Sequence, residues 1–124
     1  MMVVGVDLVE IPRVERMLAR YGERFLERVF TPGEVLYARG RTPELAARFA
    51  AKEAVAKALG VGMRMLSPEG IGWREVEVLG DQRGRPEVYL HGRAAKRAQE
   101  LGLTEWAISL SHTREYAVAF VVAR

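Results

Sequence analysis

Residues 48–60 read RFAAKEAVAKALG, and this alanine-rich stretch decides the fold because it predicts a long helix. It holds no proline and no internal glycine, and Gly60 stands where a helix commonly ends on a left-handed residue. At about 100° per residue, Glu53 and Lys57 share one stripe of small side chains. An exposed Glu–Lys pair one turn apart is ordinary in helices, and that interpretation stays open here. A second carboxylate favours a functional role for the pair.

That carboxylate belongs to Asp7, in the segment VVGVDLV at residues 3–9, which otherwise predicts a buried strand. The chain has only one other aspartate, Asp81, and it lies in a DQRG sequence typical of a turn. Aspartate is uncommon in strands, and an unpaired buried carboxylate is strongly destabilising. A structural explanation is that Asp7 lies at the frayed strand end and caps a helix starting near Pro12.

The functional explanation is that Asp7 and Glu53 converge on a hard divalent cation. Proteins hold Mg²⁺ with one or two carboxylates, completed by water and substrate phosphates. Lys57, one turn beyond Glu53, would face the same phosphates as a point charge. These three side chains therefore predict a site for phosphate chemistry.

Length and composition limit what surrounds this site. The chain has 124 residues, which is the size of one domain, so we expect a single domain over residues 1–124. It has no cysteine and no apolar stretch of membrane-spanning length, and no basic region precedes its first apolar run. We therefore expect a cytoplasmic protein without a membrane role. The net charge of +3 favours an anionic partner.

Coarse patterns along the chain predict an α+β fold. Hairpin-joined strands alternate with helices in a mixed order, which favours a mainly antiparallel sheet packed against the long helix. Thr31 and Glu34 have capping-box spacing and predict the start of a short helix. The expected elements are a strand at 3–9, helices from Pro12, at 25–30, from Thr31 and at 42–59, strands at 73–79 and 86–90, a helix at 93–101, and strands at 106–110 and 116–122.

Three segments resemble the signatures of phosphopantetheinyl transferases. GVDLVEI at residues 5–11 resembles the first signature, and RFAAKEAVAKA at 48–58 resembles the second. SLSHTREYA at 109–117 is similar to the closing segment of the short members. Length and motif order are similar to the bacterial holo-acyl carrier protein synthase subgroup, and the match runs from end to end. The resemblance implies a phosphopantetheinyl transferase-like fold and an enzyme of fatty acid biosynthesis.

The activity implied by the resemblance is Mg²⁺-dependent transfer of 4′-phosphopantetheine from coenzyme A to a serine of apo-acyl carrier protein. Adenosine 3′,5′-bisphosphate is the other product. Asp7 and Glu53 match the metal-binding carboxylates, and Lys57 matches the lysine that contacts the pyrophosphate. The attacking serine belongs to the partner, and Glu53 is the better placed carboxylate to take its proton, with a metal-held water as the alternative.

The resemblance also assigns cofactor and partner contacts. Positions matching coenzyme A contacts are Arg48, Lys57, Gly60, Gly62 and His112. A lone histidine at a strand end is otherwise most often a turn residue. Positions matching or extending the docking patch for the acidic carrier protein are Arg13, Arg20 and Arg24, although interspersed glutamates also fit a solvated helix face. Members of this short type are homotrimers with sites between neighbouring subunits, which would let Arg48 or His112 reach a cofactor bound to the Asp7 and Glu53 of another chain.

Two other classes of function stay open on the residues alone. Two carboxylates and a lysine would also serve a Mg²⁺-dependent nuclease. The arginine content, sixteen against three lysines, together with Trp73 and Trp106, would fit a nucleic-acid-binding module. Both tryptophans lie at expected strand starts, where core packing is their commoner role, so we expect no nucleic-acid partner.

Overall fold

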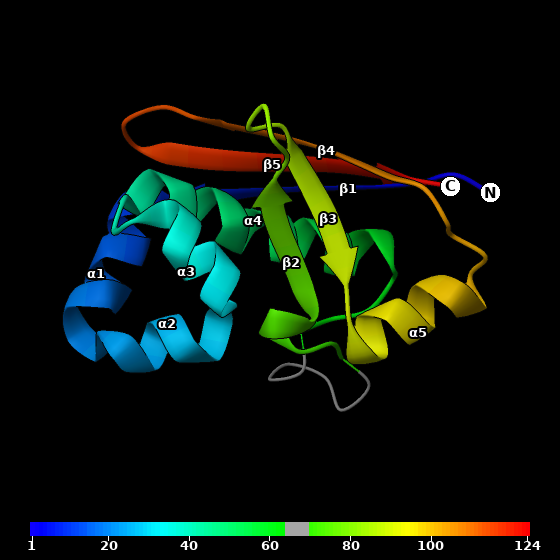
Figure 1. Cartoon of the computed structure of the whole chain (residues 1–124), viewed down its shortest axis with the longest axis horizontal. Coiled ribbons are helices and arrows are strands. Elements are labelled where there is room, and N and C mark those ends of the chain that lie inside the picture. Colours follow the sequence, from blue (N-terminus) through cyan, green and yellow to red (C-terminus); the bar gives the residue numbers. More distant parts are fainter. Residues whose placement is uncertain (64–69) are drawn as a thin grey trace.

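One long helix between two small antiparallel sheets organises the molecule (Figure 1). The computed structural model describes residues 1–63 and 70–124. Its elements are β1 (Val3–Glu10), α1 (Ile11–Tyr21), α2 (Glu23–Val29), α3 (Pro32–Ala38), α4 (Thr42–Ala58), the single 3₁₀ turn η1 (Trp73–Glu75), β2 (Val76–Gly80), β3 (Pro86–Leu90), α5 (Gly92–Glu100), β4 (Trp106–His112) and β5 (Tyr116–Ala123). The α+β class and the antiparallel pairing expected from the sequence are confirmed.

Helix α4 is the expected long helix, and it forms the centre of the core. It packs against the β1-β5-β4 sheet on one side and against α1, α3 and β2 on the others. Twelve of its 17 residues are buried, and seven of those twelve are alanines, so its neighbours approach closely on several sides. Gly60 follows the helix with φ +69°, the left-handed conformation expected of it.

The three-stranded sheet has the order β1-β5-β4, with every neighbouring pair antiparallel. Its inner face packs on α4, so alternate residues such as Gly5 and Val9 are buried. The prediction of a buried strand at 3–9 holds for one face only, because no element of the described chain covers the outer face. Val6 and Leu8 are consequently 52% and 61% exposed, and Phe120 beside them in β5 is 45% exposed.

The second sheet is the predicted hairpin of β2 and β3. Asp81 closes its turn as expected, because its Oδ1 accepts from the N–H groups of Arg83 (2.8 Å) and Arg85 (2.9 Å). The prediction of a strand starting at Trp73 is wrong, since that residue opens η1. Its ring stacks on Phe49 of α4 with centroids 4.7 Å apart, and this contact holds the segment on the helix instead of in the sheet.

Local chemistry sets the remaining helix boundaries. The capping box predicted from Thr31 and Glu34 is present at the start of α3. Helix α5 begins one residue earlier than expected, and the Glu75 carboxylate accepts from the backbone N–H of Arg93 in its first turn. Within residues 1–63 and 70–124, no helix is long and apolar enough to cross a membrane.

Candidate active site

Asp7 and Lys57 form an ion pair where β1 crosses α4. Lys57 Nζ lies 2.9 Å from Asp7 Oδ1 and donates a second hydrogen bond to the Val6 carbonyl oxygen at 3.1 Å. Asp7 lies inside β1 rather than at its end, and Glu10 is the N-cap residue of α1, with no side-chain cap bond. The helix-capping explanation for Asp7 is therefore excluded.

Gly5 explains how β1 comes so close to α4. A Cβ atom added to Gly5 would lie 1.9 Å from the carbonyl oxygen of Ala54, so only glycine permits this crossing. Asp7 follows two residues later and projects from the same face of the strand as Gly5. The crossing therefore aims the Asp7 carboxylate at the turn of α4 that carries Glu53 and Lys57.

Glu53 is a half-buried carboxylate beside this ion pair. Burial raises the pKa of Glu53 above its usual range, and the Asp7 charge raises it further, while Arg13 and Lys57 oppose the shift. The Arg13 guanidinium is therefore within electrostatic range of Glu53. Two carboxylates thus share one partly desolvated place, and a cation between them would relieve their repulsion.

The donor set fits Mg²⁺ completed by substrate oxygens. Asp7 and Glu53 offer only carboxylate oxygens, which Mg²⁺ prefers, and two such ligands are enough when a phosphate supplies others. In the part of the chain that the structure describes, no group of three or more histidine, cysteine, aspartate or glutamate side chains is arranged to hold a metal ion. The described residues therefore do not form a metal site made only of protein ligands.

Arg48 lies on a different face of α4, away from Asp7 and Glu53. Its side chain is 2% exposed, its Nε donates to the Val78 carbonyl oxygen at 3.0 Å, and its Nη1 pairs with Glu44 Oε2 at 2.9 Å. The guanidinium carbon lies 4.4 Å from the centre of the Tyr37 ring. Within one chain, the structure does not bring Arg48 to the carboxylates.

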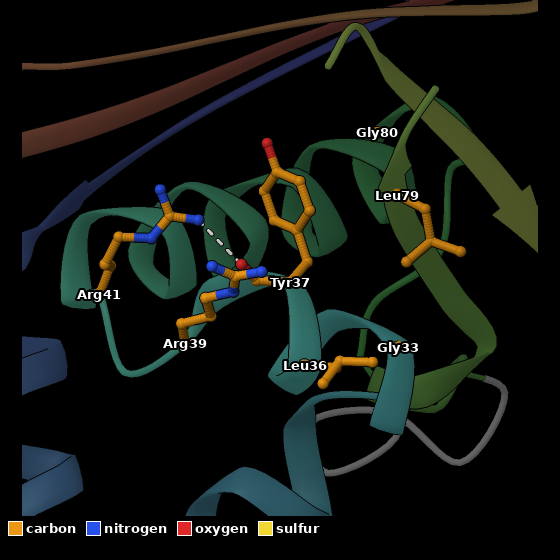
Figure 2. A pocket seen from close by; sticks show the side chains of 7 residues that line it. All are labelled: Gly33, Leu36, Tyr37, Arg39, Arg41, Leu79 and Gly80. Atoms are coloured by element: carbon orange, nitrogen blue, oxygen red, sulfur yellow. Dashed lines mark hydrogen bonds between the residues drawn. The ribbon is translucent and has the colours of Figure 1, made fainter. Parts of the chain in front are cut away.

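A cavity of about 410 Å³ opens beside Tyr37, between the end of α3 and strand β2 (Figure 2). Arg41 holds its position there by donating to the carbonyl oxygens of Tyr37 (2.8 Å) and Ala38 (2.9 Å). Sequence reasoning did not single out Arg39 and Arg41, which line this cavity, although the basic run ARGR at 38–41, between two helices, was a usable signal. The lining residues are Gly33, Leu36, Tyr37, Arg39, Arg41, Leu79 and Gly80.

The remaining cofactor candidates lie at two places. Gly60 follows the end of α4 near Lys57, and the Gly62 carbonyl accepts from the Ile71 N–H at 3.0 Å. His112 is exposed at the end of β4, where its Nδ1 lies 3.3 Å from the Thr113 carbonyl oxygen. In register His112 is two strands from β1, which is about 10 Å across the sheet, so one chain does not join it to Asp7.

The candidate docking residues Arg13, Arg20 and Arg24 are all exposed on α1 and α2. Arg24 borders a second cavity, of about 730 Å³, between these helices and α4. Its apolar lining includes Phe25 and Phe49, and charged side chains surround it. The lining residues are Met17, Tyr21, Arg24, Phe25, Glu27, Arg28, Val29, Phe49 and Arg74.

Comparisons with known proteins agree with one another over nearly the whole chain. Residues 3–121 match the family model of the 4′-phosphopantetheinyl transferase superfamily. A holo-[acyl-carrier-protein] synthase of Herpetosiphon aurantiacus is 50% identical to this chain over 124 residues, which cover 98% of each chain. Another, of Gloeobacter violaceus, is 49% identical over 122 residues, which cover 95% of this chain and 89% of that one. The crystal structure of the Helicobacter pylori holo-[acyl-carrier-protein] synthase in complex with coenzyme A is similar with a TM-score of 0.86 at 28% identity, covering 98% and 99%.

Proposed function

The chain belongs to the 4′-phosphopantetheinyl transferase superfamily, and on that basis we propose that it transfers 4′-phosphopantetheine from coenzyme A to a serine of apo-acyl carrier protein. Its relatives are holo-acyl carrier protein synthases, so it is a transferase of that type. The proposal includes release of adenosine 3′,5′-bisphosphate, a single domain over residues 1–124, and a cytoplasmic role in fatty acid biosynthesis. One observation carries it: β1 and α4 bring Asp7, Glu53 and Lys57 into one place.

In the proposed mechanism Asp7 and Glu53 would hold Mg²⁺, and coenzyme A would bind beside them. The bound ion supplies neutralising charge to the phosphate oxygens. Lys57, 58% exposed, turns its ammonium from Asp7 to the leaving phosphate as the cofactor enters. The serine oxygen attacks the phosphorus that carries pantetheine, and the bond from that phosphorus to the bridging oxygen breaks. Glu53 is proposed to accept the serine proton, with a metal-held water as the alternative.

We propose that the cavity beside Tyr37 takes the nucleotide end of coenzyme A. Arg39 and Arg41 give it positive charge for a phosphate, and Tyr37 offers an aromatic surface for a flat base (Figure 2). The phosphate contact expected of Arg48 is thereby reassigned to its neighbours, with Arg48 holding the Tyr37 ring. Arg41, at one edge of this cavity, lies twelve residues before Glu53, which is about 18 Å along the axis of α4.

We propose that the carrier protein docks on α1 and α2. Arg13, Arg20 and Arg24 are exposed there, and Arg24 borders the 730 Å³ cavity, whose apolar lining suits a side chain of the partner. An acidic protein would be steered to this basic surface, so its apparent affinity should fall as salt rises. The position of Arg13 near Glu53 is consistent with delivery of the serine to the metal site.

The protein is proposed to act as a homotrimer with sites between subunits. The outer face of the β1-β5-β4 sheet supports self-association, because Val4, Val6, Leu8 and Phe120 form a contiguous exposed apolar surface there. A second copy covering this face would bury the side chains that one chain leaves in water. Assembly would also allow His112 of one subunit to approach a cofactor held by another.

Intact-mass spectrometry of apo-acyl carrier protein tests the proposed transfer. The carrier is incubated with this protein, coenzyme A and Mg²⁺. A gain of one phosphopantetheine group, lost on adding a chelator and absent with Glu53→Ala, is expected. No gain with several carrier proteins and a folded enzyme would refute the proposed function.

A further inference from the structure

Lys52 and Glu34 form a fully buried ion pair that the proposed mechanism does not use. Lys52 Nζ lies 2.7 Å from Glu34 Oε1, and both side chains have zero exposed area. The ammonium also donates to the carbonyl oxygens of Trp73 (3.0 Å) and Val76 (2.5 Å), which accounts for all three of its N–H bonds. Burial lowers the pKa of Lys52, with the Glu34 charge opposing that shift.

The Glu34 carboxylate is equally well satisfied. Its Oε1 accepts from the Thr31 N–H at 2.9 Å, and its Oε2 accepts from the Val78 N–H at 2.9 Å. Through these contacts the pair joins the start of α3, the turn η1 and strand β2 to the middle of α4. Hydrogen bonds of this kind fix direction, which apolar contacts do not.

Helix α4 has an unusual need for such a directional anchor. Most of its buried side chains are alanines, which are too small to interdigitate deeply with neighbouring elements and so fix the orientation of the helix only weakly. On one side the Ala54 backbone rests against Gly5 of β1. Around the helix axis Lys52 lies about 160° from Ala54, so it anchors the opposite side, and Glu53 lies between the two.

We infer that the Lys52–Glu34 pair positions the site by fixing the rotation of α4, so that Glu53 and Lys57 face Asp7. This inference rests on the proposed function of those three residues. Side chains extend about 5–6 Å from a helix axis, so a rotation of about 20° would move the Glu53 carboxylate by about 2 Å. Displacements of about 1 Å at a reacting centre can cost about 100-fold in rate. Lys52 is therefore a positioning residue, because its ammonium is fully buried and bonded to Glu34 and two backbone carbonyl oxygens.

The test removes both buried charges together. The double substitution Lys52→Met with Glu34→Gln leaves no unpaired charge, which is why it is preferred to either single change. We expect a folded protein by circular dichroism, a fall in kcat of about 100-fold, and an unchanged KM for the carrier protein, whose docking surface is on α1 and α2. Binding of Mn²⁺ in the presence of coenzyme A, read from the loss of the free-ion EPR signal, should weaken at least tenfold.

Lys96→Met is the matched control, since it removes an exposed lysine of α5 and should leave both readouts unchanged. A folded double variant with wild-type Mn²⁺ affinity and kcat would overturn the inference, even if its Tm were lower. Should it not fold, Glu34→Asp withdraws the carboxylate by one methylene and keeps the charge. Wild-type Mn²⁺ affinity in that variant would overturn the inference equally. Failure of the wild-type protein to bind Mn²⁺ with coenzyme A, or to modify the carrier, would instead refute the proposed function.

Discussion

Gly5→Ala should damage the active site without touching any residue proposed to act in it. The new Cβ would lie 1.9 Å from the Ala54 carbonyl oxygen. A carbon and an oxygen in contact need about 3.3 Å, so β1 must retreat from α4 by roughly 1.4 Å. The obstacle is backbone rather than a flexible side chain, so local adjustment cannot remove the clash. Asp7 moves with the strand, away from Lys57 and Glu53.

Two measurable losses follow from that displacement. Overpacking of this size costs about 1–3 kcal/mol, which corresponds to a fall in Tm of several degrees. A shift of about 1 Å at the site should lower kcat by about 100-fold. The assay is carrier-protein modification followed by intact mass, at a temperature where circular dichroism shows the Gly5→Ala protein folded. Mn²⁺ binding with coenzyme A should weaken in parallel.

The control is a destabilised variant whose lesion lies far from the site. Leu103→Ala truncates a buried side chain between α5 and β4 and should cost about 2–5 kcal/mol while leaving the kcat of the folded protein unchanged. Near-wild-type kcat and Mn²⁺ affinity in folded Gly5→Ala would refute the reasoning, because they would mean that the crossing does not set the Asp7 position.

Three further outcomes are expected. Glu53→Gln should stabilise the metal-free protein at neutral pH, since burial and Asp7 raise the pKa of Glu53 and disfavour its charged form. The gain should fade as pH falls through the raised pKa of the folded protein and then the ordinary value of the unfolded chain, about 4.3, and urea unfolding across pH measures it. A variant less stable than wild type at pH 7 would contradict this. Arg24→Ala should raise the KM for carrier protein severalfold at low salt and much less at high salt, and an unchanged KM would remove Arg24 from the docking surface. Phe120→Glu should convert the assembly to monomers by light scattering, whereas a monomeric wild-type protein would contradict the proposed trimer.

The features predicted correctly from sequence are those set by local chemistry. The capping box at Thr31, the turn at Asp81 and the left-handed Gly60 each depend on a few neighbouring residues. Asp7 was noticed because a carboxylate in an apolar strand needs a partner, and Lys57 is that partner in the structure. The metal ion that the sequence predicts between Asp7 and Glu53 stays a prediction.

What the sequence did not reveal depends on contacts between distant segments. Arg48 was assigned to a cofactor, yet its guanidinium bonds to a β2 carbonyl and stacks on Tyr37, neither of which is close to it in sequence. The Lys52–Glu34 pair is 18 residues apart in sequence and carries no periodic signal. The exposure of Leu8 could not be read from an apolar run either, because such a run looks the same whether one or both faces are covered.

Helix α4 presents Lys52 in one direction and Glu53 with Lys57 in another, and each direction has a separate purpose. The angle between these two directions around the helix axis is kept when residues are substituted, but it changes when residues are inserted or deleted. One residue inserted after Lys52 would rotate the rest of α4 by about 100°. Glu53 and Lys57 would then no longer face Asp7, while Lys52 kept its contacts. Related sequences can therefore differ from this chain in the residues of α4 but not in their number. The exposed turn at 81–85, by contrast, can accept inserted residues without rotating α4.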